Sequence, residues 1–597
     1  MMSAPSRTEL ISSPRPRPST QFEAVPNADR ALPRLAVAAV LVAIFGIFGA
    51  RCWPVARGDA ITSDETTHLI RVLNLFQNGD DLAMWELGAP RLPHVMGGYA
   101  SYLALRADGM MPASADMEKI ARLVVSGMPR VVVPARCVAI GWGMLLIGLV
   151  FWAAARTRGA ISGLIAAGLV STVPECLAHS AIAGSDMPFT TSAFFSLICM
   201  ARYIEKPTAR RWALAALAVG LAWAMRHTAL VLLILAAGIH LVVALRKPRA
   251  PGVAPLAEVL ASSGLAIVAM GVISFTVLWA GDGFGTLTLG EVAGRASRGL
   301  PQRMGPIDVS RLQIPSSAVS VVKQVRHQNA GHEAFLCGEF GQSGWPSYFP
   351  IAFLLKTPTG LLMLFVLAVA RMKLGRPSPW DAVAIAFLGL LWLMLVRNKV
   401  NIGVRYAVLT YPLAMPFVAR MFEGRALRDR VWGPVVLISA GWFAVASIGA
   451  HGRYLSSFNE IGGGPKMGWM YLADSNIDWG QDFDALGRTI ETLGIKEVTT
   501  DVSSERRLDL PGVFTVMNRS KATQVPAATP PNRRLYDDEG EYLPIYTRYV
   551  AVSVSRLHGL YSQNDVSWLR TRRLVSRVGD SIFLFDMDRP AERPFVE

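Results

Sequence analysis

Residues 35–76 read LAVAAVLVAIFGIFGARCWPVARGDAITSDETTHLIRVLNLF. The part up to Trp53 is almost entirely apolar, and a helix needs about 20 such residues to cross the core of a bilayer. Asp64, Glu65 and His68 follow where the chain has just left this apolar segment. The stretch therefore predicts a membrane-spanning helix that leads directly into a polar segment at the membrane surface.

The whole chain has the composition of an integral membrane protein. Of its 597 residues, 52% are hydrophobic and 17% are charged, whereas about a quarter of the residues in soluble domains are charged. The mean hydropathy is +0.35. The net charge of +15 is typical of basic cytoplasmic loops, so we interpret it in that way and expect no nucleic-acid partner. The scattered cysteines form no CxxC or Cys/His cluster, so the sequence predicts neither a zinc site nor a disulfide framework.

The apolar segments predict about eleven transmembrane helices. They lie near residues 35–53, 137–155, 160–178, 188–204, 211–226, 228–245, 257–280, 347–370, 381–397, 405–421 and 431–450. The hydropathy falls after Gly452, and a soluble domain begins there. Its apolar residues recur at helical spacing over 483–493, and strands are predicted at 496–502, 548–555 and 581–586. The expected fold class is a polytopic α-helical membrane protein with a C-terminal soluble α/β domain.

The orientation follows from the distribution of lysine and arginine. The loops at 156–159, 202–211, 246–249, 371–376 and 420–430 are all basic, and basic loops stay in the cytoplasm. We therefore expect a disordered cytoplasmic tail (1–34) and a transmembrane domain (35–452) with outside loops at 54–136, 179–187 and 280–346. An extracytoplasmic domain (453–597) follows.

Three acids lie on the predicted outside. Asp64 and Glu65 follow the first span, and either form a solvated polar face or take part in chemistry. Asp186 lies in the next outside loop, where the chain re-enters the membrane ahead of Pro188. It fits a helix N-cap as well as a catalytic carboxylate.

The cations in the predicted outside loops require an explanation, because positive charge is disfavoured there. Arg397, Lys399 and Arg405 lie in one short outside loop, where they fit either a phosphate clamp or anionic lipid headgroups. Lys356 lies inside a predicted span, and a charge at the centre of a spanning helix costs about 2.5–3.5 kcal/mol. It either serves a function beside the helix break at Thr357-Pro358 or extends to the interface.

Acids and cations together on the outside fit an enzyme whose donor is a sugar on a long lipid phosphate. An acid takes the proton from an acceptor hydroxyl as general base, and cations stabilise the phosphate that leaves. The sequence has no glycine-rich loop of the GxxxxGK[ST] type for a soluble nucleotide.

Six segments in order resemble a known family. They are SDETTH (63–68), GSDMPF (184–189), GWPSYFPIAFLLKTPTGLL (344–362), NIGVRYAVLTYPL (401–413), YLSSFNEIGGGP (454–465) and DSNIDWGQD (474–482). Together they resemble the GT-C membrane glycosyltransferases of the dolichyl-phosphate-mannose-protein mannosyltransferase and aminoarabinose transferase type. The resemblance covers about residues 35 to 485.

The resemblance implies an inverting glycosyltransferase in the inner membrane of a bacterium, with its site facing outward. The donor would be a polyprenyl-phosphate sugar, and the acceptor a hydroxyl of a protein, lipid or glycan. The resemblance implies no particular cofactor and leaves a divalent cation open. The implied catalytic residues are Asp64 as base, Glu65 as its partner and Asp186 as a second acid. The implied donor-phosphate ligands are Lys356, Arg397, Lys399 and Arg405, and further candidate substrate contacts are His68, Arg226, His227, Asn476 and Asp478.

Some of these residues also fit a purely structural role. Asn476 and Asp478 also fit a turn and cap that open the following helix, and Arg226 and His227 also fit an interfacial anchor. A transporter or flippase of a lipid-linked substrate is the alternative for the whole chain. Transporters usually have related halves with interrupted helices in matching positions, and the sequence shows no such internal symmetry.

Overall fold

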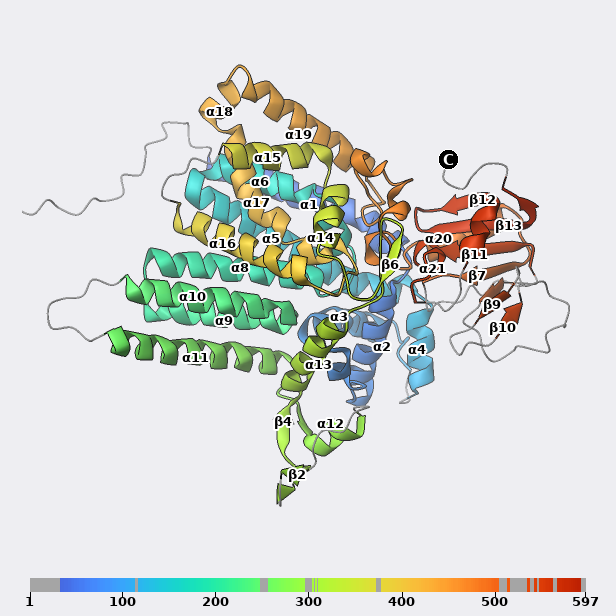
Figure 1. The fold of residues 1–597 in the computed structure, drawn as a ribbon, viewed down its shortest axis with the longest axis horizontal. Helices are drawn as coiled ribbons and strands as arrows, with labels where there is room; N and C mark the ends of the chain where they lie inside the picture. The colour runs from blue at the N-terminus through green and yellow to red at the C-terminus, as the bar shows by residue number, and fades with distance from the viewer. Residues whose placement is uncertain are drawn as a thin grey trace, which may run out of the picture.

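The computed structural model describes residues 33–591 apart from 113–115, 247–255, 296–302, 305–306, 309, 372–376, 504–512, 516–533, 537–541, 545–546 and 562–565. The predicted disordered tail therefore lies, except for its last two residues, outside the described part of the chain. Within that part, a bundle of long helices forms one side of the molecule and a domain containing a β-sheet forms the other (Figure 1).

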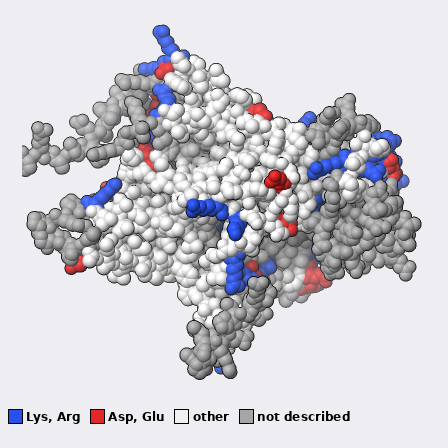
Figure 2. Space-filling model, in the orientation of Figure 1, with Lys and Arg blue, Asp and Glu red and all other residues white. Residues whose placement is uncertain are grey.

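The helices of the bundle lie at every predicted span. They are α1 (Arg34–Gly58), α5 (Pro129–Arg158), α6 (Ala160–Ser171), α7 (Pro174–Ser180), α8 (Asp186–Glu205), α9 (Ala209–Met225), α10 (Leu230–Leu245), α11 (Leu256–Gly281), α14 (Tyr348–Lys356), α15 (Thr359–Ala370), α16 (Pro379–Arg397), α17 (Thr410–Ala419) and α19 (Trp432–Gly449). Figure 2 shows that few charged side chains lie along the visible length of this bundle and that they gather toward its two ends.

Six of the described helices are long and apolar enough to cross a membrane, and the number is eight if each of two bent pairs counts as one span. The pairs are α6 with α7, bent by 69°, and α14 with α15, bent by 113°. Of the other predicted spans, α8 is buried along nearly its whole length among α5, α9, α10 and α16. A helix enclosed by other helices need not be apolar on every face. The predicted polytopic helical fold is confirmed.

The segment between α1 and α5, predicted only as an outside loop, contains helices. They are α2 (Ser63–Asn78), the 3₁₀ helix η1 (Met84–Leu87), α3 (Leu92–Ala107) and α4 (Met117–Val125). A capping box begins α2, because the Glu65 amide donates to the Thr62 hydroxyl and the Glu65 carboxylate accepts from the Thr62 amide. Gly79, in the left-handed conformation with φ of 74°, ends it. The buried Leu69 and Leu73 pack it against α3 and α4.

The second long outside segment, after α11, has short strands and helices. They are β1 (Thr286–Thr288), α12 (Leu289–Arg295), β2 (Arg303–Met304), β3 (Ile307–Asp308), β4 (Gln313–Pro315), α13 (Ser316–Ala330), β5 (Ala334–Leu336) and β6 (Glu339–Gly341). The strands pair as antiparallel two-stranded ladders, β1 with β4, β2 with β3 and β5 with β6.

The C-terminal domain is built on a five-stranded sheet in the order β12-β13-β11-β7-β8. Strand β11 pairs in parallel with β7 and antiparallel with β13. The predicted helix is α20 (Phe483–Thr492), and the predicted strands are β7 (Val498–Asp501), β11 (Tyr549–Ser553) and β13 (Ile582–Pro590). The α/β class of this domain is confirmed. The remaining elements are α21 (Val554–Leu557), β8 (Val513–Thr515), β12 (Arg572–Val578) and the hairpin β9 (Arg534–Tyr536) with β10 (Tyr542–Pro544).

An irregular segment joins the bundle to this domain. It runs from the end of α19 to α20 and contains the 3₁₀ helices η5 (Glu460–Gly462), η6 (Gly468–Met470) and η7 (Asp474–Asn476). The Ala60 amide donates to the Gln481 carbonyl at 2.9 Å, and Ala60 is buried in the core of the C-terminal domain with Phe483 and Leu486. The start of α2 is thus fixed against the chain that enters the domain.

Helices α15 and α19 approach each other closely at Gly360. A Cβ atom there would lie 2.4 Å from the Ser439 carbonyl oxygen and 2.5 Å from the Phe443 amide nitrogen, which are backbone atoms of α19. We expect Gly360→Ala to lower the free energy of unfolding by about 1–3 kcal/mol because the two helices must separate. The midpoint of thermal unfolding in detergent measures this. Gly389→Ala on α16, where a Cβ meets nothing within 4 Å, is the matched control, and equal effects of both changes would contradict the close approach.

Candidate active site

Asp64 lies in the first turn of α2, at the end of the bundle that faces the C-terminal domain (Figure 1). Its Oδ2 is 3.1 Å from Nη1 of Arg405, and the two side chains are 48% and 10% exposed. Arg405 belongs to the 3₁₀ helix η3 (Val404–Ala407), and its guanidinium lies 4.5 Å from the ring centroid of Trp479. A half-exposed carboxylate is therefore paired with a cation that is largely withdrawn from solvent.

A second pair lies beside the first. Asp186, the first residue of α8, forms an ion pair with Arg226, the residue that follows α9. The Arg226 guanidinium lies 4.3 Å from the ring centroid of Tyr406, and the Arg405 guanidinium lies 5.9 Å from the same centroid. The two pairs therefore meet at Tyr406. The N-cap interpretation of Asp186 is wrong: Ser185 occupies the N-cap position, without a side-chain capping hydrogen bond, and the Asp186 carboxylate binds Arg226.

Lys356 ends α14 at the helix break that the sequence predicted. Its Nζ is 3.1 Å from Oε1 of Glu175 and donates to the carbonyl oxygens of Asn476 at 2.7 Å and Leu455 at 2.5 Å. The side chain is fully buried, so Lys356 does not extend to the interface. The ammonium instead joins α14, α7 and the segment that leads to the C-terminal domain.

His179 connects the Lys356 pair to the Asp186 pair. Its Nε2 is 3.5 Å from Oε2 of Glu175, and its Nδ1 is 3.7 Å from Oδ2 of Asp186. Glu175 and His179 both lie on α7, and neither was among the sequence-predicted residues. Glu175 carried a signal, because an acid within an otherwise apolar span is expected to have a function or a partner. The site is therefore a continuous series of acids and cations from Asp64 to Lys356.

Glu65 points away from this series and is buried against Arg136. The Arg136 Nε and Nη2 donate to the two carboxylate oxygens at 2.8 and 2.7 Å, and the Ala183 amide donates to Oε1 at 2.8 Å. Burial raises the pKa of Glu65, but the charge of Arg136 and the hydrogen bonds together hold it below its ordinary value. Glu65 is therefore an ionised, fully bonded carboxylate that fixes the position of its neighbour Asp64.

The predicted histidines lie at two different places. The rings of His68 and His94 stack with their centroids 3.4 Å apart. Burial, and then the charges of Arg71 and Arg405, lower the pKa of His68 to about 3, so its ring is neutral at physiological pH. His227, in the 3₁₀ helix η2 (His227–Ala229), instead pairs through Nε2 with the Ser320 hydroxyl at 2.8 Å.

Asn476 and Asp478 hold neighbouring segments in place. The Asn476 side chain donates to the Tyr348 hydroxyl at 2.8 Å and accepts from the Val404 amide at 2.9 Å, so it positions the 3₁₀ helix that carries Arg405. The Asp478 carboxylate accepts from the Ser555 amide and the Ser503 hydroxyl, each at 3.0 Å. Its contacts therefore lie in the C-terminal domain.

Arg397 and Lys399 are exposed at the end of α16. Lys399 Nζ donates to the Asn329 carbonyl at 3.4 Å, and in the described part of the chain neither cation forms an ion pair with an acid of the series. Within the same described residues, no group of three or more His, Cys, Asp or Glu side chains could hold a metal ion.

Part of the chain that contains several of these residues matches a known protein family. Residues 122–279 match the family model for dolichyl-phosphate-mannose-protein mannosyltransferases, a range that includes Glu175, His179, Asp186 and Arg226. This match confirms the resemblance that the sequence motifs indicated. The chain is a multi-pass membrane protein, and the class of enzyme that it resembles is glycosyltransferase.

Two solved structures are similar over much of the chain. ArnT from Cupriavidus metallidurans, bound to undecaprenyl phosphate, is 12% identical, with 92% of this chain and 97% of that chain covered and a TM-score of 0.43. The oligosaccharyltransferase of Archaeoglobus fulgidus in its apo form is 13% identical, with 77% and 58% covered and a TM-score of 0.41. No curated protein matches.

Removing the buried ammonium tests the role of Lys356. We expect Lys356→Met to lower the free energy of unfolding by about 3–5 kcal/mol, because Glu175 loses the cation with which it is buried. Lys356→Met combined with Glu175→Gln should recover much of the loss, since no unpaired charge remains. Thermal unfolding in detergent compares the variants. A single variant as stable as the wild type would contradict the contacts described.

Because the pKa of His68 is lowered in the folded chain, we expect the protein to lose stability in acid. Its pKa is about 3 in the folded chain and about 6.5 when unfolded, so the unfolded chain binds more protons below pH 6.5. Between pH 7 and pH 5 this group should cost up to about 2 kcal/mol of stability. His68→Phe keeps the stacked ring and cannot be protonated, so its unfolding midpoint should fall less than that of the wild type. Equal falls would show that His68 is not the group responsible.

Proposed function

We propose that this protein is an inverting glycosyltransferase that transfers a sugar from a polyprenyl-phosphate donor to a hydroxyl acceptor at the outer face of a bacterial inner membrane. One observation carries the proposal: the half-exposed carboxylate of Asp64 is held by the nearly buried Arg405, beside a second acid-cation pair. A base that solvent and acceptor can reach lies within contact distance of a cation that can bind phosphate.

Asp64 is the general base in this proposal. Its carboxylate takes the proton of the acceptor hydroxyl while the acceptor oxygen attacks the anomeric carbon of the donor. The bond from that carbon to the phosphate oxygen breaks, and its electron pair leaves with the lipid phosphate. A single displacement of this kind inverts the configuration at the anomeric carbon. The acceptor is a hydroxyl of a protein, a lipid or a glycan.

Arg405 and Arg226 are the proposed ligands of the leaving phosphate. Guanidinium groups bind phosphate oxygens in a bidentate manner, and both groups lie near the Tyr406 ring, Arg226 at 4.3 Å and Arg405 at 5.9 Å from its centroid. Each is already paired with a carboxylate, so a bound phosphate would compete with Asp64 for Arg405. Donor binding would thereby loosen the Asp64 carboxylate and prepare it to accept a proton.

Five of the other predicted residues have supporting roles in this proposal. Lys356 and Glu65 are positioning residues, since their charges are buried and fully engaged. Arg397 and Lys399, which are exposed, attract the anionic lipid to the membrane surface beside the site. Asp186 holds Arg226.

The orientation is also a proposal. Ion pairs bring together Arg156 with Glu205, at 3.4 Å, and Arg158 with Glu423, at 3.8 Å. Three of the basic loops therefore gather at one end of the bundle, and α18 (Gly424–Arg428) lies at that end while the C-terminal domain lies at the other (Figure 1). The positive-inside rule assigns the basic end to the cytoplasm. Asp64 and residues 453–597 are then outside.

Replacing the base tests the proposal. In nanodiscs, we expect Asp64→Asn to transfer sugar from radiolabelled polyprenyl-phosphate donors to a membrane extract about 10²–10⁴-fold more slowly than the wild type, because an amide cannot accept the proton. Label that leaves the lipid is the readout, and a panel of sugars covers the donor. Glu118→Gln on α4, where the side chain is 72% exposed, is the matched control and should transfer at the wild-type rate.

Two results would contradict the proposed function. Wild-type rates in Asp64→Asn would show that this carboxylate is not the base. Label that crosses the bilayer of liposomes without leaving its lipid, in both proteins, would instead establish a flippase.

A further inference from the structure

A groove of about 650 Å³ opens on the side of the helical bundle, along α8 and between α5 and α9. Asp186 begins α8, whereas Arg202, at the groove, lies close to its end. At 1.5 Å per residue, about 24 Å of helix separates the two. The groove is therefore distinct from the candidate active site and lies at the basic end of the bundle.

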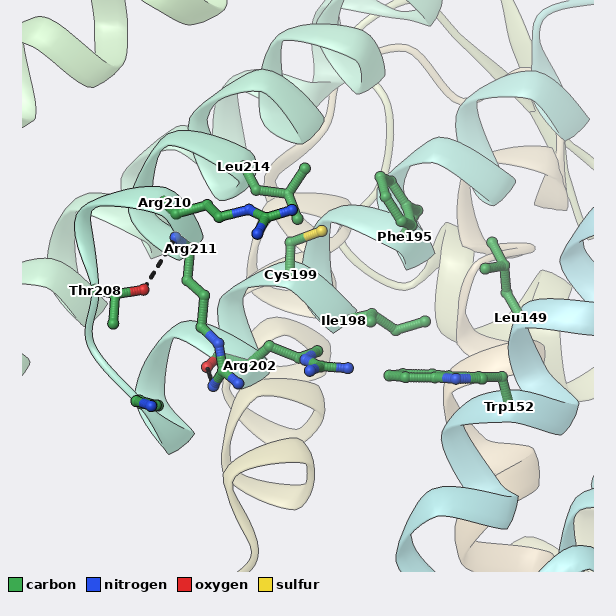
Figure 3. Close-up of a pocket in the computed structure, with 11 residues that line it drawn as sticks. Leu149, Trp152, Phe195, Ile198, Cys199, Arg202, Thr208, Arg210, Arg211 and Leu214 are labelled. Atoms are coloured by element: carbon green, nitrogen blue, oxygen red, sulfur yellow. Dashed lines mark hydrogen bonds between the residues drawn. The ribbon is translucent and has the colours of Figure 1, made fainter.

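The wall of the groove is apolar and its rim is basic. The apolar side chains that line it are Leu149, Trp152, Phe195, Ile198, Cys199 and Leu214, and the basic ones are Arg202, Lys206, Arg210 and Arg211. Figure 3 shows Arg202 and Arg210 extending from α8 and α9 over this apolar wall. The Arg202 guanidinium lies over the indole ring of Trp152, 5.7 Å from the ring centroid.

The rim carries more positive charge than its own acids neutralise. Arg211 donates to the Arg202 carbonyl at 2.6 Å and lies 3.9 Å from Glu205, and Glu205 also pairs with Arg156. In the part of the chain that the structure describes, no acidic side chain forms an ion pair with Arg202, Lys206 or Arg210. Three cations thus surround one end of an apolar groove.

We propose that this groove binds an anionic phospholipid, with the head-group phosphate at Arg202, Lys206 and Arg210 and an acyl chain along the apolar wall. Basic pockets between transmembrane helices at the cytoplasmic side suit anionic head groups, and the volume is within the range of sites for small ligands. A free phosphate would need only the cations. The apolar wall, with Trp152 and Leu214 partly exposed beside it, provides a surface for a chain that stays in the membrane.

Native mass spectrometry of the full chain in detergent tests this site. Phosphatidylglycerol and phosphatidylcholine with the same acyl chains are the probes, and the wild type should bind phosphatidylglycerol more tightly. Each cation near a head group contributes roughly a five-fold gain in affinity, so Arg202→Gln with Arg210→Gln should lose more than about ten-fold. Arg428→Gln with Arg430→Gln removes the same charge from exposed positions at the same end of the bundle and should change binding little.

A second variant distinguishes lipid binding in the groove from binding to a charged surface. Leu214→Trp fills the groove without changing its charge, so it should weaken phosphatidylglycerol binding, and this arm does not require the double variant to fold. Inorganic phosphate in excess should not displace the lipid. The proposal would be overturned by equal binding of the two lipids, by an equal loss in the control pair, by wild-type binding in Leu214→Trp, or by displacement with phosphate, which would indicate a site for a free anion.

Discussion

The ion pair between Arg136 and Glu65 fixes the geometry on which the candidate active site depends. Besides both Glu65 oxygens, the Arg136 guanidinium binds the carbonyl of Ala56 in the last turn of α1 and those of Asp59 and Ala60 just after it. Breaking a buried pair of this kind leaves an unpaired buried charge, which is strongly destabilising. Glu65 also holds the Ala183 amide, three residues before Asp186. One buried interaction thus joins the end of α1, the start of α2 and the entry to α8, and so positions both acids of the site.

The remaining charges follow the same constraint. At this end of the bundle Glu175 and Lys356, Asp186 and Arg226, and Asp64 and Arg405 each combine an acid with a cation, and burial is tolerable because every charge is paired. The pairs differ in access to solvent: Lys356 is fully buried, whereas Asp64 is about half exposed. Because of this difference in exposure, we assign the proposed chemistry to Asp64 and Arg405 and a positioning role to Lys356.

The sequence predicted the architecture well because bilayer thickness sets the length of apolar segments, and strand periodicity marked β7, β11 and β13. The sequence also indicated Lys356, Asp186 and Arg405 as candidate functional charges. It could not supply their partners. Arg136 is 71 residues from Glu65. Lys356 contacts Glu175 where two bent helix pairs meet, since Lys356 ends α14 at the bend to α15 and Glu175 lies at the start of α7, after the bend from α6. Adjacent acids looked equivalent in the sequence, but helix geometry turns Glu65 inward and leaves Asp64 at the surface.

In the proposed mechanism, a donor phosphate replaces Asp64 as the partner of Arg405. Calorimetry on the wild type, Asp64→Asn and Arg405→Gln in nanodiscs can test this exchange by measuring the binding of a short-chain polyprenyl phosphate. We expect weaker binding in Arg405→Gln and binding in Asp64→Asn that is at least as tight as in the wild type, since the competing carboxylate is gone. Unchanged binding in Arg405→Gln, or weaker binding in Asp64→Asn, would contradict it.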